Sequence, residues 1–134
     1  MRESDFGAKF QRWWQVNKLH NVAAFEYKVT KTNTFNLTQW HKKQPLQYIN
    51  LMKATTDEGV IWKISDTDPR EKPFDGFFIS NSPAYLVIWF HMKRRFFMVP
   101  VKMIPDQTSV SYQWCDERLP ARTLWQPAPK IHDL

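Results

Sequence analysis

The chain has 134 residues, a formal net charge of +6 at neutral pH and a single cysteine, Cys115. One cysteine excludes an intrachain disulfide and makes a cysteine-based zinc site implausible, so we expect a reducing, cytoplasmic setting. The chain lacks an apolar stretch long enough to cross a bilayer, which predicts a soluble protein without a membrane partner. Its pI near 9.6 makes an anionic partner, above all nucleic acid, the leading expectation.

Hydrophobic periodicity predicts a helix, a strand and a further helix in the first half of the chain, and strands after it. Helical spacing in the first half is interrupted at Pro45, and proline is well tolerated only at the first helical position. We therefore expect a turn up to Lys43 and a new helix from Pro45. After Gly59 the pattern changes to strands joined by polar or proline-containing turns. The other expected elements are a helix over Ser4 to Asn17, a strand over Val22 to Thr30, a polar connection over Lys31 to Asn36, and strands over Val60 to Ile64, Phe74 to Ser80, Ala84 to Phe90 and Phe96 to Met103.

This order of elements predicts one α/β (α+β) domain over residues 1–134, with a mixed central β-sheet flanked by helices. We expect the core to span about residues 3–103. The proline-rich segment 104–134 is expected to be irregular, apart from a short helix near Pro120 to Trp125. The strand Ala84 to Phe90 is apolar on both faces and predicts a buried strand with Trp89 in the core.

The tripeptide Glu26-Tyr27-Lys28 places two opposite charges on one face of the first expected strand. Side chains alternate along a strand, so Glu26 and Lys28 share a face, while Phe25, Tyr27 and Val29 share the core face. A carboxylate that holds a hard divalent cation, beside a lysine that stabilises anionic charge, suits attack on a phosphate. The alternative is a solvated pair of surface charges on an edge strand.

Asp75 is the acid of an otherwise apolar strand. Burial of a lone carboxylate costs several kcal/mol unless a cation or hydrogen-bond donors meet it, so Asp75 requires a partner. The alternative is an aspartate at the mouth of the strand, solvated or capping a turn. Asp66 is a weaker candidate for an acid of the site and is expected to be a turn residue.

Together these segments resemble the PD-(D/E)XK nuclease superfamily. Pro73-Phe74-Asp75 and Glu26-Tyr27-Lys28 are similar to the two halves of its signature, and Gln44 with Tyr48 resembles the QxxxY element of some branches. The run from Phe25 to Gln44 is similar to that of Holliday-junction resolvases of bacteria and phages. The motif order is permuted, because the aspartate strand normally precedes the ExK strand. The resemblance therefore implies a restriction-endonuclease-like core with a relocated aspartate hairpin.

The resemblance also implies roles for individual residues. Asp75 and Glu26 would bind Mg²⁺, for which Mn²⁺ could substitute, and Glu3 or Asp5 would complete the site, with Glu3 preferred. Lys28 would orient the attacking water, and Gln44 would contact the scissile phosphate. The expected DNA-binding residues are Lys42, Lys43, Tyr48, Lys93, Arg94 and Arg95.

The expected function is Mg²⁺-dependent hydrolysis of phosphodiester bonds in branched DNA, as in a resolvase. Symmetric cleavage of two strands requires two sites and so predicts a homodimer. With only 3 glycines and no phosphate-binding loop, a nucleotide cofactor is not expected. The small size and the resemblance favour a phage protein acting in the host cytoplasm. The alternatives are a non-catalytic nucleic-acid-binding protein that retains the fold, and a protein-interaction module whose charge is incidental.

Overall fold

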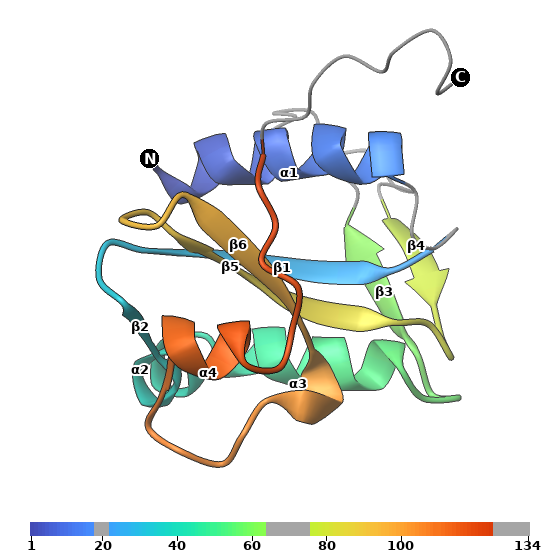
Figure 1. Cartoon of the computed structure of the whole chain (residues 1–134). Helices are drawn as coiled ribbons and strands as arrows, with labels where there is room; N and C mark the ends of the chain where they lie inside the picture. The colour runs from blue at the N-terminus through green and yellow to red at the C-terminus, as the bar shows by residue number, and fades with distance from the viewer. Residues whose placement is uncertain (18–21, 64–75, 125–134) are drawn as a thin grey trace, which may run out of the picture.

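The computed structural model describes residues 1–17, 22–63 and 76–124 of the chain. Its helices are α1 (Glu3–Asn17), α2 (Leu37–Lys43), α3 (Pro45–Ala54) and α4 (Tyr112–Asp116), its 3-10 turn is η1 (Val101–Met103), and its strands are β1 (Ala24–Thr30), β2 (Thr34–Asn36), β3 (Val60–Lys63), β4 (Gly76–Ile79), β5 (Ala84–Phe90), β6 (Arg95–Pro100) and β7 (Ser109–Ser111). Helix α1 covers one face of the main sheet, and α2, α3 and α4 lie on its other side (Figure 1). The expected mixed α/β class is confirmed.

The main sheet has the strand order β1-β5-β6. Strand β1 runs parallel to β5, from the pair Ala24 and Ala84 to the pair Thr30 and Phe90, and β5 is antiparallel to β6. Strand β5 is thus central and has helices on both faces, which explains its continuous apolar sequence. Because β1 and β5 are parallel, their carboxyl ends meet at one edge of the sheet, where the amide of His91 donates to the carbonyl of Thr30 at 3.0 Å.

Helix α1 and the sheet face beneath it form an aromatic core. Phe6, Phe10 and Trp13 are buried against Trp89 and Phe96, so Trp89 is a core residue as predicted. The helix approaches β1 closely at Gly7, where an added Cβ would lie 3.1 Å from the Tyr27 ring.

The second core lies between the opposite sheet face and helices α2 to α4. Leu86, Ile88 and Phe97 of the sheet share it with Trp40 and Leu51 of the helices. Ala24 also belongs to it, so the face of β1 that carries Glu26 and Lys28 is covered by core at its start. The expectation that a single face of β1 is core is therefore wrong at Ala24, which is buried on the face that carries Glu26 and Lys28.

Several expected connections contain regular structure. The polar stretch Lys31–Asn36 includes β2, which pairs with β7, and the predicted turn before Pro45 is helix α2. The segment expected to be irregular contains β7 and α4, and it contributes Val110 and Cys115 to the second core. Residues 120–124 are not helical, because Arg122 forms a bridge with Phe96. The last expected strand ends at Pro100 and continues as η1.

Strands β3 and β4 form the expected antiparallel hairpin. Val60 pairs with Ile79 and Ile61 with Phe78, and in the part of the chain that the structure describes these strands make a two-stranded sheet of their own. Ile79 is buried in the second core, whereas Ile61 and Phe78 are exposed. Asp75 and Asp66 lie outside the described residues. Among the described helices, none is both long and apolar enough to cross a membrane.

Candidate active site around Lys28

Lys28 lies on the edge strand β1, and it is only 6% exposed. A buried ammonium needs hydrogen-bond acceptors, because desolvation strongly disfavours an unpaired charge. Two acceptors meet it: Lys28 Nζ donates to Gln44 Oε1 at 2.7 Å and to Glu3 Oε1 at 3.3 Å. Three residues of the predicted site therefore converge, and they come from segments far apart in the sequence.

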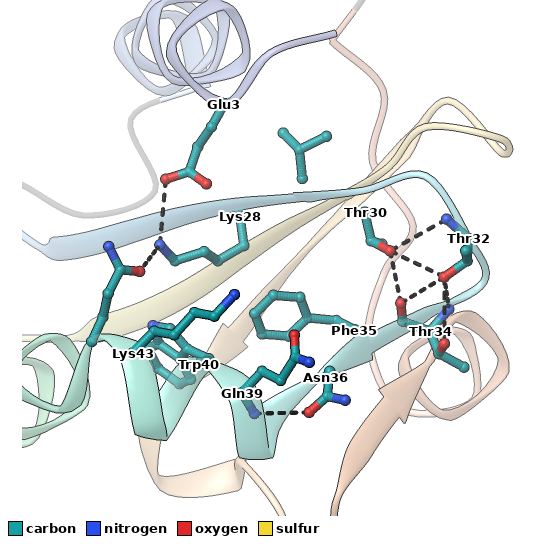
Figure 2. A pocket seen from close by; sticks show the side chains of 12 residues that line it. Glu3, Lys28, Thr30, Thr32, Thr34, Phe35, Asn36, Gln39, Trp40 and Lys43 are labelled. Carbon is teal, nitrogen blue, oxygen red and sulfur yellow. Dashed lines mark hydrogen bonds and ion pairs between the residues drawn. The ribbon is translucent and has the colours of Figure 1, made fainter.

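Local structure explains how Glu3 and Gln44 reach this lysine. Glu3 begins α1, which lies on one face of the sheet. The side chain of Glu3 points toward Lys28 (Figure 2). Gln44 joins the two helices on the other face: its amide closes α2 through Trp40 O at 2.9 Å, and Pro45 begins α3. Its side chain does not cap α3, and its oxygen instead accepts from Lys28. The ammonium thus bridges the two helical layers at the open edge of the sheet.

The two acids of the first helical turn have different partners. Glu3 pairs with Lys28, whereas Asp5 pairs with Arg2 at 3.2 Å. The guanidinium of Arg2 lowers the pKa of the Asp5 carboxyl. Glu3, which the sequence preferred over Asp5, is therefore the acid of this turn that contacts Lys28. Gln11, about two helical turns after Glu3, donates to the Tyr27 hydroxyl at 3.0 Å, and burial raises the pKa of that tyrosine.

Glu26 lies two residues before Lys28 on β1, and it is partly buried. Strand alternation places it on the same side as Lys28. Asp75, its expected partner, falls outside the described residues. Within residues 1–17, 22–63 and 76–124, no three acidic, histidine or cysteine side chains come together as a metal site.

A cavity of about 630 Å³ opens beside Lys28, and Glu26 is not among its lining residues. Figure 2 shows its lining side chains, with the Phe35 ring in their midst and Lys43 beside Trp40. The hydroxyls of Thr30, Thr32 and Thr34 form one wall. The lining residues are Glu3, Lys28, Val29, Thr30, Thr32, Thr34, Phe35, Asn36, Gln39, Trp40, Lys43 and Gln44.

The threonine wall is held together by its own hydrogen bonds. Thr30 Oγ1 and Thr32 Oγ1 donate to the carbonyl of Thr34 at 2.7 and 2.9 Å, and these two hydroxyls lie 3.2 Å apart. Asn36 then caps α2, accepting from the amide of Gln39 at 2.8 Å. The sequence reasoning missed this wall. Its signal is the threonine alternation at positions 30, 32 and 34, which continues the spacing of Glu26 and Lys28.

The expected DNA-binding residues of α2 and α3 are divided between two cavities. Lys43 lines the cavity beside Lys28, whereas Lys42 and Tyr48 line a second one of about 720 Å³ with residues 104–108. The Tyr48 ring packs edge-on against His41, with centroids 4.9 Å apart. The structure therefore brings Gln44, but not Tyr48, to Lys28.

Lys93 and Arg94 lie in the β5–β6 turn, and Arg95 is the first residue of β6. This turn lies beside the β1–β2 turn at the edge where the parallel strands end (Figure 1). Lys93 sits over the Tyr112 ring, 5.5 Å from its centroid, and the Tyr112 amide donates to the carbonyl of Asn33. The three cationic side chains are thus placed at the same end of the molecule as the threonine wall.

Comparisons with models of protein families, with curated proteins and with solved structures found no match.

Proposed function

We propose that this protein is a magnesium-dependent DNA endonuclease that cuts branched DNA, as a Holliday-junction resolvase does. The observation that supports this proposal is the buried Lys28 between Glu3 and Gln44. The PD-(D/E)XK resemblance assigns these same three residues to one site. It does so although the order of the motifs is permuted in this chain. Their convergence requires α1, β1 and the α2–α3 junction to pack as they do.

The carboxylates near Lys28 are of the chemical type that binds a hard cation. Glu3 and Glu26 offer carboxylate oxygens at the edge of β1, and Mg²⁺ prefers such ligands. Two carboxylates are fewer than the expected set, and Asp75 would complete it. A bound Mg²⁺ would polarise the scissile phosphate and promote ionisation of a water.

Lys28 and Gln44 have complementary roles in this proposal. The ammonium would orient the attacking water and stabilise the negative charge that develops on the phosphate. Gln44 accepts from Lys28 through its oxygen, which leaves the amide NH₂ group to donate to the scissile phosphate. Burial of Lys28 strengthens the effect of its charge, because charge interactions are less screened away from water.

Lys43 and the basic β5–β6 turn would hold the phosphates that flank the cleavage point. Lys43, Lys93 and Arg94 are exposed, and Arg95 is partly buried at the start of β6. Exposed cations of this kind set affinity and salt dependence rather than chemistry. In a homodimer, two such edges would face the two strands to be cut.

The test is cleavage of four-way junction, flapped and linear DNA with Mg²⁺, Mn²⁺ or EDTA, by the native chain and by Lys28→Met. We expect metal-dependent cleavage of branched DNA by the native chain. Lys28→Met should lose at least about 100-fold in rate, which corresponds to about 2.7 kcal/mol of transition-state stabilisation, while it binds DNA within a few-fold of the native chain.

The matched control is Lys53→Met, which removes one positive charge from the far end of α3. The Lys53 side chain is 42% exposed and pairs with Glu58 at 3.4 Å, so this variant should cleave normally. Equal cleavage by the Lys28 and Lys53 variants would contradict the proposal. Salt-sensitive DNA binding with no cleavage in any metal would favour the non-catalytic binding protein, and indifference to DNA would favour the interaction module.

A further inference from the structure

We propose that the cavity beside Lys28 holds one unpaired nucleotide of the DNA strand, with its base against the Phe35 ring and its phosphate between Lys28 and Lys43. This inference rests on the proposed function and adds the feature of branched DNA that the site recognises. The size of the cavity is the first observation that supports it. Its volume of about 630 Å³ lies in the range of pockets that hold one small molecule, and a single nucleotide is a ligand of that size.

Phe35 supplies an aromatic surface inside this cavity. Its ring is partly buried: it packs against the second core, with its centroid 6.2 Å from that of Trp40, and it also lines the cavity. Bases stack on aromatic side chains with little dependence on sequence, because every base has a π face. A phenylalanine that lines the same cavity as two lysines therefore suits a nucleotide better than an apolar ligand.

The chain around Phe35 is held by hydrogen bonds on both sides of the ring. Strand β2 pairs Phe35 with Val110 of β7, the threonine hydrogen bonds fix the turn before it, and Asn36 caps the helix after it. A site that is ordered before the ligand arrives loses less conformational entropy on binding. The segment that carries Phe35 is thus suited to receive a flexible, unpaired nucleotide.

Cationic and polar groups mark the position of the phosphate. Lys28 and Lys43 line the same cavity, together with the side-chain amides of Gln39 and Gln44. Only one acid, Glu3, lies among these lining residues, and Lys28 is its partner. Unpaired nucleotides occur where strands separate, at branch points and flaps, so the cavity would position such a point next to the buried lysine.

The first test is photocrosslinking of the native chain in EDTA. Four-way junctions and single strands that carry 5-iododeoxyuridine would be irradiated, and the modified peptide identified by mass spectrometry. We expect crosslinks at Phe35 from the junction and from the single strand, and not from a fully paired duplex. Crosslinks confined to other residues would overturn the inference, and this test needs no variant.

The second test measures the affinity for an oligo(dT) strand in EDTA. Phe35→Leu should weaken binding by about fivefold or more, because one base stack is lost. Phe78→Leu is the matched control, since Phe78 is 61% exposed on the β3–β4 hairpin. Equal affinities of the two variants would overturn the inference. Free dTMP that binds as tightly as oligo(dT) would also overturn it, since the site would then select a nucleotide rather than a strand.

These outcomes separate the inference from the proposed function. Crosslinking at Phe35 by a native chain that cuts no DNA would uphold the nucleotide site and reject the nuclease. Normal cleavage by Phe35→Leu, with native affinity for oligo(dT), would reject the nucleotide site and leave the nuclease proposal standing.

Discussion

Replacement of Lys28 by methionine tests whether this lysine serves the fold or the site. Its side chain is 7% exposed, and methionine keeps most of the aliphatic stem while it removes the ammonium. Burial of an ammonium costs several kcal/mol even after the protein relaxes. Its two hydrogen bonds contribute about 1.5–3 kcal/mol each, so the charged group has a net effect on stability close to zero.

The two partners of Lys28 do not become buried, unpaired polar groups when the ammonium is removed. The Glu3 side chain is 52% exposed and Gln44 is exposed, so water can solvate both. We therefore expect Lys28→Met to leave the free energy of unfolding unchanged or to raise it by about 1–2 kcal/mol. Lys28→Ala also removes the buried stem and should lower it by about 2–3 kcal/mol.

Urea unfolding followed by tryptophan fluorescence measures these differences, with equal m-values as the check that the unfolded states are comparable. Each kcal/mol corresponds to about 3–5 °C in Tm for a chain of this size. A loss above about 2 kcal/mol in Lys28→Met would refute the reasoning. It would mean that the bridge between α1 and α3 holds the layers together and that the lysine is structural.

Three further predictions concern other parts of the molecule. Gly59→Ala should lower the free energy of unfolding by about 1–3 kcal/mol, since Gly59 has φ +67° and an added Cβ would lie 2.7 Å from the carbonyl oxygen of Ile79; an unchanged Tm would contradict this. Burial raises the pKa of Cys115 to about 12, so iodoacetamide should modify this thiol only on unfolding; rapid labelling of the native chain would contradict this expectation. For the same reason the free energy of unfolding should fall as pH rises from about 9 towards 12. Finally, Lys43→Met should reduce the slope of log affinity for DNA against log salt by about 1, measured by fluorescence anisotropy, with Lys53→Met as the control that keeps the native slope.

Sequence pattern was sufficient for elements whose stability is mainly local or whose burial is complete. The apolar stripe of Phe6, Phe10 and Trp13 predicted α1, and Pro45 marked the start of α3. The run Ala84–Phe90 was recognised as a buried strand because helices cover both of its faces. In each case the residues that specify the element lie within it.

The short strands β2 and β7 escaped the sequence reasoning for the opposite reason. Each has three residues, and neither has a pattern that would identify it alone. They exist because Thr34–Asn36 and Ser109–Ser111 pair across a long separation in the chain. Helix α4, whose cap is Ser111, follows from that pairing and carries Cys115 into the core.

The sequence by itself determined which residues of the candidate site to consider: the alternation of β1 put Glu26 and Lys28 on one side, and the family resemblance added Glu3 and Gln44. Only the tertiary structure decided that Lys28 is buried, that Glu3 and Gln44 reach it from opposite layers, and that a cavity with Phe35 opens beside it. The physical reason is that the environment of a charged side chain depends on what packs around it. Alternation along a strand specifies a direction, whereas contact and burial arise from helices that are distant in the chain.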